Sequence, residues 1–497
     1  MITDSEHGTH RTGAGSERCT VPAPDPPWIC RNDRQEVYPL PLSNREVARE
    51  PHVLAITGNA RSPAAGFLAL VPTRSRDAAA TRARAGVTDK KGTAMTMDLA
   101  IFGRDWWNHA HEIAAARREQ GAVHRATIPR GEQEIPVWVI VRYEEAQAAL
   151  ADPRLSKDVD GLTKILDKHL TVDGEKPNLS SMFSPHMIFS DPPRHTRLRR
   201  LLMKHFTRPR VEALKPRIEQ MTAELLNDLP LGREVDLIAE VAFPLPLYAI
   251  CELIGVPAKK RGVLRAWTYA LMEDLPERAD TASKKMQAYL LELIETARAN
   301  PGEDLLSALV QEAEDEDRLS LPELLGTLFL LFVAGHETTT ALIGNAVACL
   351  LADDGRLWRE LGQRPELLPG AVKEISRYDA AVATATHRFT EDEVTIDGTT
   401  IPAGEIVLIS LLSANRDDRQ FDRADQLDIQ RKESNLAFGY GIHYCLGAQL
   451  GLMETESLVG ALTRRFPDAR LVDGAQLRRR QPAMIPNSWR DLPVILG

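Results

Sequence analysis

Phe438-Gly-Tyr-Gly-Ile-His-Tyr-Cys445-Leu-Gly447 is the most informative stretch of the chain. It surrounds one thiol with three glycines, and an amphipathic helical pattern begins directly after it. Glycine lets backbone N–H groups approach a sulfur atom closely, and a helix N-terminus lowers the pKa of a thiol. A free cysteine is usually a small buried hydrophobic residue, but that role does not explain the glycines. The stretch therefore predicts a loop that holds a thiolate.

A second motif, Ala334-Gly-His-Glu-Thr-Thr339, interrupts an apolar helical pattern with an acid and two hydroxyls. Burying such groups without partners costs about 1 to 3 kcal/mol each. A threonine can donate to the carbonyl four residues earlier, so we expect Thr338 to bond to Ala334 and bend the helix. Gly335 is expected to leave room above a cofactor. The motif therefore predicts either a polar functional site on a core helix or a simple kink.

The same motif has a metal-binding alternative. His336-Glu337 begins the pattern His-Glu-x-x-His, in which two histidines one helical turn apart bind zinc. Residue 340 is a threonine, so the second ligand is missing. The zinc interpretation is therefore disfavoured.

A third segment, which starts after Pro192-Pro193, places two cations on the apolar side of a helix. At about 100° per residue, His195 and Arg199 share a face with three apolar residues, Leu198, Leu202 and Phe206. Buried cations need anions. We therefore expect an anionic partner, supplied from outside the helix.

The composition bounds the function. The chain has 497 residues, is 43% hydrophobic and carries a net charge of -9, which argues against a general nucleic-acid binder, because such proteins need a positive field. The five cysteines are widely spaced and odd in number, which does not indicate a disulfide framework. We therefore expect the protein to lie in a reducing cytoplasm. The longest apolar run, residues 328–334, is far shorter than the roughly 20 residues that span a bilayer, and no signal peptide is visible. We therefore expect a soluble protein without a membrane anchor.

Residues 1–95 differ from the rest. They are rich in Pro, Gly, Arg, Ser and Thr and show no sustained period, so they cannot bury enough apolar surface to offset their ordering entropy. We expect a disordered extension, or a start codon assigned too far upstream, since patterned sequence begins near Met95 and Met97. Residues 96–497 are expected to form one domain.

The expected fold class is mainly α with a small β subdomain. Residues 125–128 and 136–141 flank a glycine-containing turn and predict a β-hairpin, and further strands are expected at 394–396 and 405–409. Helical periodicity dominates elsewhere, notably over residues 196–206, 209–226, 321–351 and 446–466.

The cysteine loop resembles the haem-binding signature of the cytochrome P450 family, which has Phe, Gly, Gly, His, Cys and Gly at the same offsets. The resemblance implies the single haem-enclosing P450 fold, haem b as cofactor, and Cys445 as the axial thiolate, which favours cleavage of the O–O bond. The helical motif resembles the family's oxygen-activating motif, in which the acid and the alcohol, here Glu337 and Thr338, deliver protons. The residues that the resemblance assigns to the haem are His195, Arg199, Ala334, Arg388, His443 and Cys445.

Glu374-Ile-Ser-Arg377 coincides with the family's structural Glu-x-x-Arg pair, which supports the haem loop. Taken alone, this is a common pair worth a few tenths of a kcal/mol. Many relatives complete the network with a further arginine, where our register places Gln426. Arg423 is a candidate substitute, and the third partner stays open.

The resemblance implies a monooxygenase that inserts one oxygen atom from dioxygen into a small lipophilic substrate, such as a polyketide, macrolide, terpenoid or steroid. Electrons would come from NAD(P)H through a ferredoxin reductase and a ferredoxin, which we expect to dock on Arg197, Arg200 and Lys204. We expect a monomer whose pocket is lined by residues 155–190 and 380–386. Two alternatives are a peroxide-driven enzyme of the same fold, which would not need Glu337 and Thr338, and a haem-binding sensor or carrier.

Overall fold

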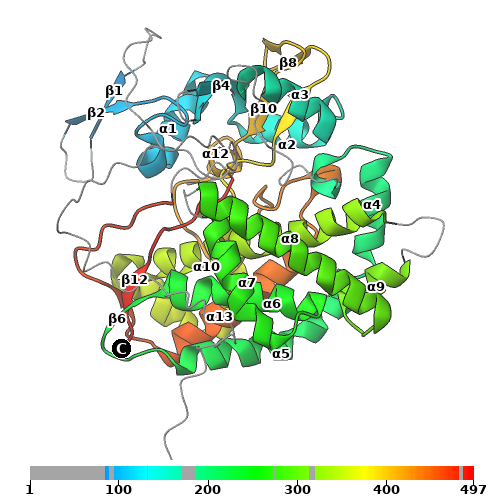
Figure 1. Ribbon diagram of the computed structural model, residues 1–497. Helices are drawn as coiled ribbons and strands as arrows, with labels where there is room; N and C mark the ends of the chain where they lie inside the picture. Colours follow the sequence, from blue (N-terminus) through cyan, green and yellow to red (C-terminus); the bar gives the residue numbers. More distant parts are fainter. Residues whose placement is uncertain are drawn as a thin grey trace, which may run out of the picture. The chain divides into compact units, whose positions relative to one another are not determined.

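The computed structural model describes residues 84–88, 94–130, 133–170, 186–272, 276–312, 319–480 and 485–497. The chain divides into two units, residues 1–60 and 61–497, and every described residue belongs to the second. Helices make up most of this unit, and the larger sheet gathers with α1, α2 and α3 on one side of it (Figure 1). The expected fold class is confirmed.

The larger sheet contains the expected hairpin. β3 (Val123–Arg130) pairs antiparallel with β4 (Gln133–Ile140), and β4 pairs in parallel with β10 (Ile406–Ile409). β10 is followed by β7 (Arg388–Thr390) and, at the edge, by β5 (Leu155–Ser156). The sheet thus brings residues near 157 beside residues near 388, far apart in the sequence.

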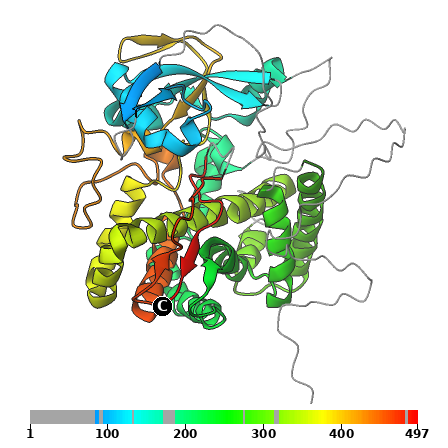
Figure 2. The ribbon, with the colours of Figure 1, turned by 90° about the vertical axis from the view of Figure 1, so that its left-hand side faces the viewer.

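α10 (Leu321–Gln363) runs across the helical part, as Figure 2 shows. Its first turn is closed by a capping box, in which Ser320 and Glu323 satisfy each other's backbone N–H groups. The backbone leaves the helical conformation from Ala352 to Gly355, so the expected helix over residues 321–351 ends where the structure breaks it. α10 packs mainly against α13 (Ala448–Arg465) and α6 (Pro244–Ile254).

The expected helices over residues 196–206 and 209–226 are α4 (Arg194–Met203) and α5 (Arg208–Asn227). The other helices are α1 (Trp106–Gln120), α2 (Tyr143–Ala151), α3 (Val159–Leu170), α7 (Ala258–Met272), α8 (Pro276–Ala299), α9 (Leu305–Glu312), α11 (Leu368–Tyr378) and α12 (Leu411–Ala414). The remaining strands are β1 (Arg84–Thr88), β2 (Ala94–Asp98), β6 (Glu234–Asp236), β8 (Val394–Ile396), β9 (Thr399–Ile401), β11 (Arg470–Leu471) and β12 (Pro493–Ile495).

The segment expected to be disordered contains one described strand. β1 pairs antiparallel with β2, with Arg84 opposite Asp98. The other residues before Ala94 lie outside the described residues.

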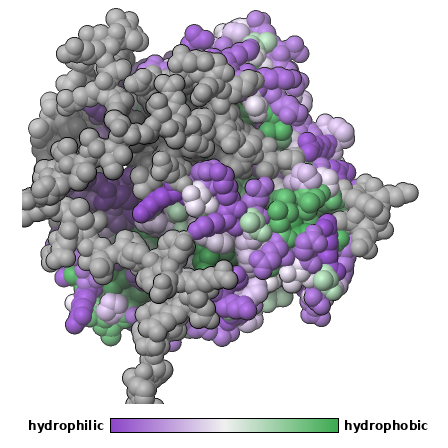
Figure 3. Space-filling view, in the orientation of Figure 1, coloured by the Kyte–Doolittle hydropathy of each residue, from purple (hydrophilic) through white to green (hydrophobic). Residues whose placement is uncertain are grey.

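Within the described part of the chain, α10 is the one helix long and apolar enough to cross a membrane. Most of its apolar window, 72%, is buried inside the protein, as in the core helix of a soluble protein. The described residues on the face in Figure 3 are mainly hydrophilic, with separate small apolar patches.

Candidate functional site

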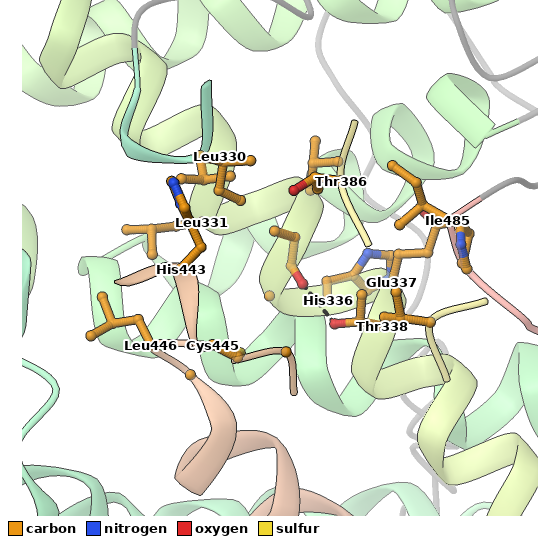
Figure 4. Close-up of a pocket in the computed structure, with 18 of the residues that line it drawn as sticks. Leu330, Leu331, His336, Glu337, Thr338, Thr386, His443, Cys445, Leu446 and Ile485 are labelled. Carbon is orange, nitrogen blue, oxygen red and sulfur yellow. Dashed lines mark hydrogen bonds between the residues drawn. The ribbon is translucent and has the colours of Figure 1, made fainter. Parts of the chain in front are cut away.

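One cavity of about 540 Å³ lies between α10, the cysteine loop, α4 and the larger sheet. Such a volume is typical of small-molecule sites. All eight site residues expected from the sequence line it: His195, Arg199, Ala334, Glu337, Thr338, Arg388, His443 and Cys445. Figure 4 shows Cys445 and His443, from the segment that leads into α13, across the cavity from Glu337 and Thr338 of α10.

The cysteine loop is closed by its own backbone. The N–H of Cys445 donates to the carbonyl of Phe438 at 2.9 Å. Gly439 and Gly441 have φ of +76° and +73°, a region that side chains rarely adopt. A Cβ on Gly441 would also lie 3.3 Å from the carbonyl oxygen of Leu150. The loop therefore needs Gly439 and Gly441, and it leaves the Cys445 side chain exposed to the cavity.

The thiol pKa differs from the expectation. Burial raises the pKa of Cys445, whereas a backbone hydrogen bond from Gly447 and the charge of Arg199 lower it. The net direction is upward, because desolvation of the charged form outweighs both favourable contacts. Loop and helix alone therefore do not lower the pKa of this thiol below its usual value, and a bond to a metal is what would hold it as a thiolate.

Thr338 makes the expected bond to its own helix: its hydroxyl donates to the carbonyl of Ala334 at 2.7 Å. Thr339 and Thr340 make the same kind of bond, at 3.1 and 3.0 Å, to Gly335 and His336. Three hydroxyls in a row thus bond to carbonyls four residues earlier, which bends helices.

Gly335, which was expected to leave room above a cofactor, is also a close contact between two helices. A Cβ at this position would lie 2.8 Å from Cδ1 of Ile250 on α6. The glycine also lines the cavity. The space left by its missing side chain is therefore used by packing between α6 and α10.

Glu337 is buried, with 8% of its surface exposed, in the wall of the cavity. Burial raises the pKa of its carboxyl to about 7, although the charge of Arg480 acts in the opposite direction. A carboxyl that titrates near neutral pH is suited to accept and release protons.

His336 is fully buried beside Phe243, with ring centroids 4.2 Å apart in an edge-to-face arrangement. Burial lowers the pKa of His336 to about 3, so the ring is neutral at physiological pH. Thr340 occupies the position where a zinc motif needs its second histidine. Among the described residues, no three His, Cys, Asp or Glu side chains are grouped as metal ligands.

The cationic residues meet at one end of the cavity. His195 of α4 is 2% exposed, and its ring lies 4.3 Å from the ring of His443. Arg199 donates to the carbonyl of Tyr444 at 2.8 Å. In the described part of the chain, Nε2 of both histidines is buried without a hydrogen-bond partner. Buried ring nitrogens without partners beside the Arg199 guanidinium fit a ligand that carries carboxylates, as haem does.

The arginine that completes the Glu374 network is Arg431, which the sequence analysis missed. Nε of Arg431 lies 3.2 Å from Glu374, and Glu374 also pairs with Arg377 at 2.7 Å. Gln426 contributes only its backbone carbonyl, which accepts from Arg377 at 3.1 Å. The Arg423 side chain points to solvent and pairs with Asp422. The third partner therefore stands five residues after position 426, the position expected from the sequence, and Arg423 does not replace it.

The basic residues expected to receive a ferredoxin, Arg197, Arg200 and Lys204, are partly neutralised within the protein. Arg197 forms an ion pair with Glu323 at the start of α10, and Arg194 lies 3.4 Å from the same carboxylate. Arg200 and Lys204 have exposed side chains. Of the three basic residues, Arg200 and Lys204 therefore remain the exposed ones.

The expected pocket-lining segments are only partly described, because residues 171–185 lie outside the described residues. From 155–190, the lining residues are Lys157, His186, Met187, Ile188 and Phe189, and from 380–386 they are Ala381, Val382, Ala385 and Thr386. Sequence reasoning missed the apolar wall formed by Ile250, Leu330, Leu331 and Ile485. No local pattern marks these residues as cavity-lining rather than core.

Comparison with known proteins agrees with this site. The family model for Cytochrome P450 matches residues 260–468. The chain is 43% identical to Cytochrome P450 107B1 of Saccharopolyspora erythraea over 82% of this chain and 99% of that protein. It is 41% identical to 6-deoxyerythronolide B hydroxylase of the same organism, over 66% and 83% of the two chains.

Solved structures agree as well. The tirandamycin C-bound P450 monooxygenase TamI superimposes with a TM-score of 0.73 at 40% identity, covering 80% of this chain and 99% of TamI. The cysteine loop, the α10 motif and these relatives together show that this chain belongs to the cytochrome P450 family of monooxygenases.

Proposed function

We propose that this cytochrome P450 monooxygenase uses haem b and electrons from a ferredoxin to hydroxylate or epoxidise a lipophilic substrate of the polyketide or macrolide type. The observation that carries the proposal is that Cys445 and the Glu337–Thr338 pair line the same cavity. A thiol ligand and a proton source on opposite sides of one site are what oxygen activation requires.

The chain's own residues divide the work. Haem held by Cys445 would supply the oxygen chemistry. His195, Arg199, Arg388 and His443 would anchor its carboxylates.

The distal residues handle protons. Glu337, whose pKa burial raises to about 7, would accept protons from solvent and pass them inward. The Thr338 hydroxyl, oriented by the Ala334 carbonyl, would hold a water or proton at the oxygen site. By delivering protons, Thr338 and Glu337 would direct the consumed electrons to oxygenated product rather than to hydrogen peroxide.

The apolar wall supports a lipophilic substrate. Leu330, Leu331 and Ile485 line the cavity opposite the polar end. Relatives whose names mention 6-deoxyerythronolide B and tirandamycin C act on or bind polyketide-type molecules, which supports this substrate class.

Electron supply and location complete the proposal. An acidic ferredoxin, reduced by NAD(P)H through its reductase, would dock near Arg200 and Lys204, while Arg197 is engaged by Glu323. We propose a cytoplasmic monomer.

A screen of polyketides, macrolides, terpenoids and steroids for a substrate-induced spin-state shift tests this function. Hits are then incubated with NAD(P)H, a surrogate ferredoxin and its reductase, or with hydrogen peroxide alone. We expect oxygenated product in the ferredoxin arm. Product only in the peroxide arm would favour the peroxide-driven alternative, and binding without product in either arm would favour a sensor or carrier.

A further inference from the structure

Lys157 is a fully buried lysine in the wall of the cavity, with 1% of its surface exposed. It follows directly after β5. Its backbone N–H donates to Oδ2 of Asp191 at 2.9 Å, and the Ser156 hydroxyl donates to the same oxygen at 2.7 Å. Its ammonium group donates to the hydroxyl of Thr386, which also lines the cavity. It lies in the expected pocket-lining range 155–190, but the sequence pattern assigns it no role toward a cofactor.

Strand pairing sets Lys157 against another cation. β5 runs antiparallel to β7, with Leu155 opposite Thr390 and Ser156 opposite Phe389. Lys157 follows directly after the last paired residue of β5, and both Lys157 and Arg388 donate to Thr386. Arg388 is only 3% exposed. Burying two basic groups close together is costly unless negative charge balances them. The pair needs an anion.

One described carboxylate, Asp191, acts on both side chains: burial lowers the pKa of Lys157 and that of Arg388, and the charge of Asp191 opposes this shift in both, so two basic groups share one acid. The Arg388 guanidinium donates to the carbonyls of Leu150 and Thr386, at 3.2 and 3.4 Å. Within the described ranges, neither Lys157 nor Arg388 forms an ion pair with an acidic side chain. Oδ2 of Asp191 already accepts two hydrogen bonds from the β5 segment. Both cations line the cavity, so an anion bound there would meet both.

We propose that Lys157 binds a haem carboxylate together with Arg388, as a fifth anchoring side chain beside His195, Arg199, Arg388 and His443. This inference rests on the haem cofactor of the proposed function. Lys157 lines the same cavity as His195, Arg199, Arg388 and His443, the residues that would anchor the haem carboxylates. A haem carboxylate therefore fits this place better than a substrate carboxylate does.

The test compares ferric haem-loaded wild type with Lys157→Met, Lys157→Arg and Lys164→Met. Lys164 is an exposed lysine on α3 and serves as the matched control. Haem transfer to excess apomyoglobin should be about tenfold faster for Lys157→Met, because one charge-assisted hydrogen bond is lost. Lys157→Arg should retain most of the wild-type resistance, and Lys164→Met should match the wild type. Resonance Raman spectra should show a shifted haem propionate bending band in Lys157→Met alone.

Unchanged haem transfer and an unmoved propionate band in Lys157→Met would overturn the proposal. Faster transfer with an unmoved band would also overturn it, because a purely structural lysine would loosen the pocket without changing the carboxylate.

A substrate carboxylate is tested by titrating wild type and Lys157→Met with dodecanoic acid and with dodecanol. Loss of a preference for the acid in Lys157→Met, with unchanged haem transfer, would assign the lysine to substrate and contradict the proposal. Because haem transfer and the Raman band need neither substrate nor turnover, failure of the proposed reaction and failure of this inference are separable.

Discussion

Thr338 tests the chemistry at the scale of single residues. Thr338→Ala removes a hydroxyl that faces the cavity, while electron supply does not use this group. NAD(P)H consumption should therefore persist, while the fraction that ends in product falls by about tenfold or more and hydrogen peroxide rises. Parallel assays of NAD(P)H, peroxide and product measure this partition.

Thr340→Ala is the matched control. Thr340 makes the same bond to a carbonyl four residues earlier but is not among the residues that line the cavity. Its coupling should match the wild type. Equal coupling in both variants would mean that the Thr338 hydroxyl only bends the helix.

Glu337 should reveal its burial through the pH dependence of stability. Its pKa rises from an ordinary 4.5 to about 7 in the folded protein, so the folded state binds more protons between these values. The contribution of Glu337 to the free energy of unfolding is therefore most favourable below pH 4.5, and it falls as the pH rises towards 7. Glu337→Gln should match the wild type in unfolding free energy near pH 4.5 and exceed it above pH 7, by about 3 kcal/mol at most.

Urea unfolding at pH 5 and pH 8 measures this difference. Glu366→Gln, at a carboxyl that is 65% exposed, should shift by less than about 0.5 kcal/mol at both values. A Glu337→Gln variant with the same pH dependence as the wild type would show that this carboxyl is solvated.

The site residues that could be predicted from the sequence are those that stand in short contiguous motifs. Cys445, Glu337 and Thr338 stand within contiguous motifs, and the structure places them on one cavity. Lys157 was expected only as part of a pocket-lining segment, and Arg431 was missed, because the residues that give them a role, Arg388 and Glu374, come from distant segments. Nothing adjacent to either residue in the chain marks it as buried.

At the scale of elements, the Glu374 network joins α11 to the segment before the cysteine loop. Arg377 donates to the carbonyls of Asn415, Ala424 and Gln426, and Arg431 shares its carboxylate partner. Arg431→Ala should lower the unfolding free energy by about 3 kcal/mol or more, because it breaks a buried ionic network. Urea unfolding of the haem-loaded protein measures the loss.

Arg423→Ala serves as the comparison, because the Arg423 side chain is 60% exposed. It should cost less than about 0.5 kcal/mol. Equal losses in the two variants would contradict the assignment of Arg431 as the third partner.

Element types followed from periodicity, whereas their pairing did not. The hairpin of β3 and β4 was predictable, since its strands are neighbours in the sequence. The pairs β4–β10 and β5–β7 join strands separated by more than 200 residues, and their register depends on the packing of the whole sheet. That register is what brings Lys157, one residue after β5, close to Arg388 at the start of β7.

At the scale of the whole molecule, a buried polar cluster ties distant segments together. Asp379, after α11, pairs with Arg479 at 2.6 Å and accepts from Asn487 at 2.9 Å. Asn345 of α10 accepts from Arg479 at 2.7 Å, and His111 of α1 lies 3.4 Å from Asp379. The cluster fixes the C-terminal segment that carries Ile485 into the cavity wall.

The N-terminal residues should add little to this molecule. A chain that begins at Met95 should equal the full chain in haem content, and its thermal midpoint should agree within a few degrees. The composition of residues 1–95 gives them no core of their own. Loss of haem or a large drop in the midpoint would show that the extension is structural.

The thiolate assignment is tested most directly by the spectrum of the reduced carbon monoxide complex, which reports the axial ligand. The wild-type protein should show the red-shifted thiolate-type Soret band. Cys445→Ser should lose that band while its far-ultraviolet circular dichroism stays helical, because the loop is held by its backbone rather than by the thiol. A Cys445→Ser variant that keeps the thiolate-type band would contradict the account.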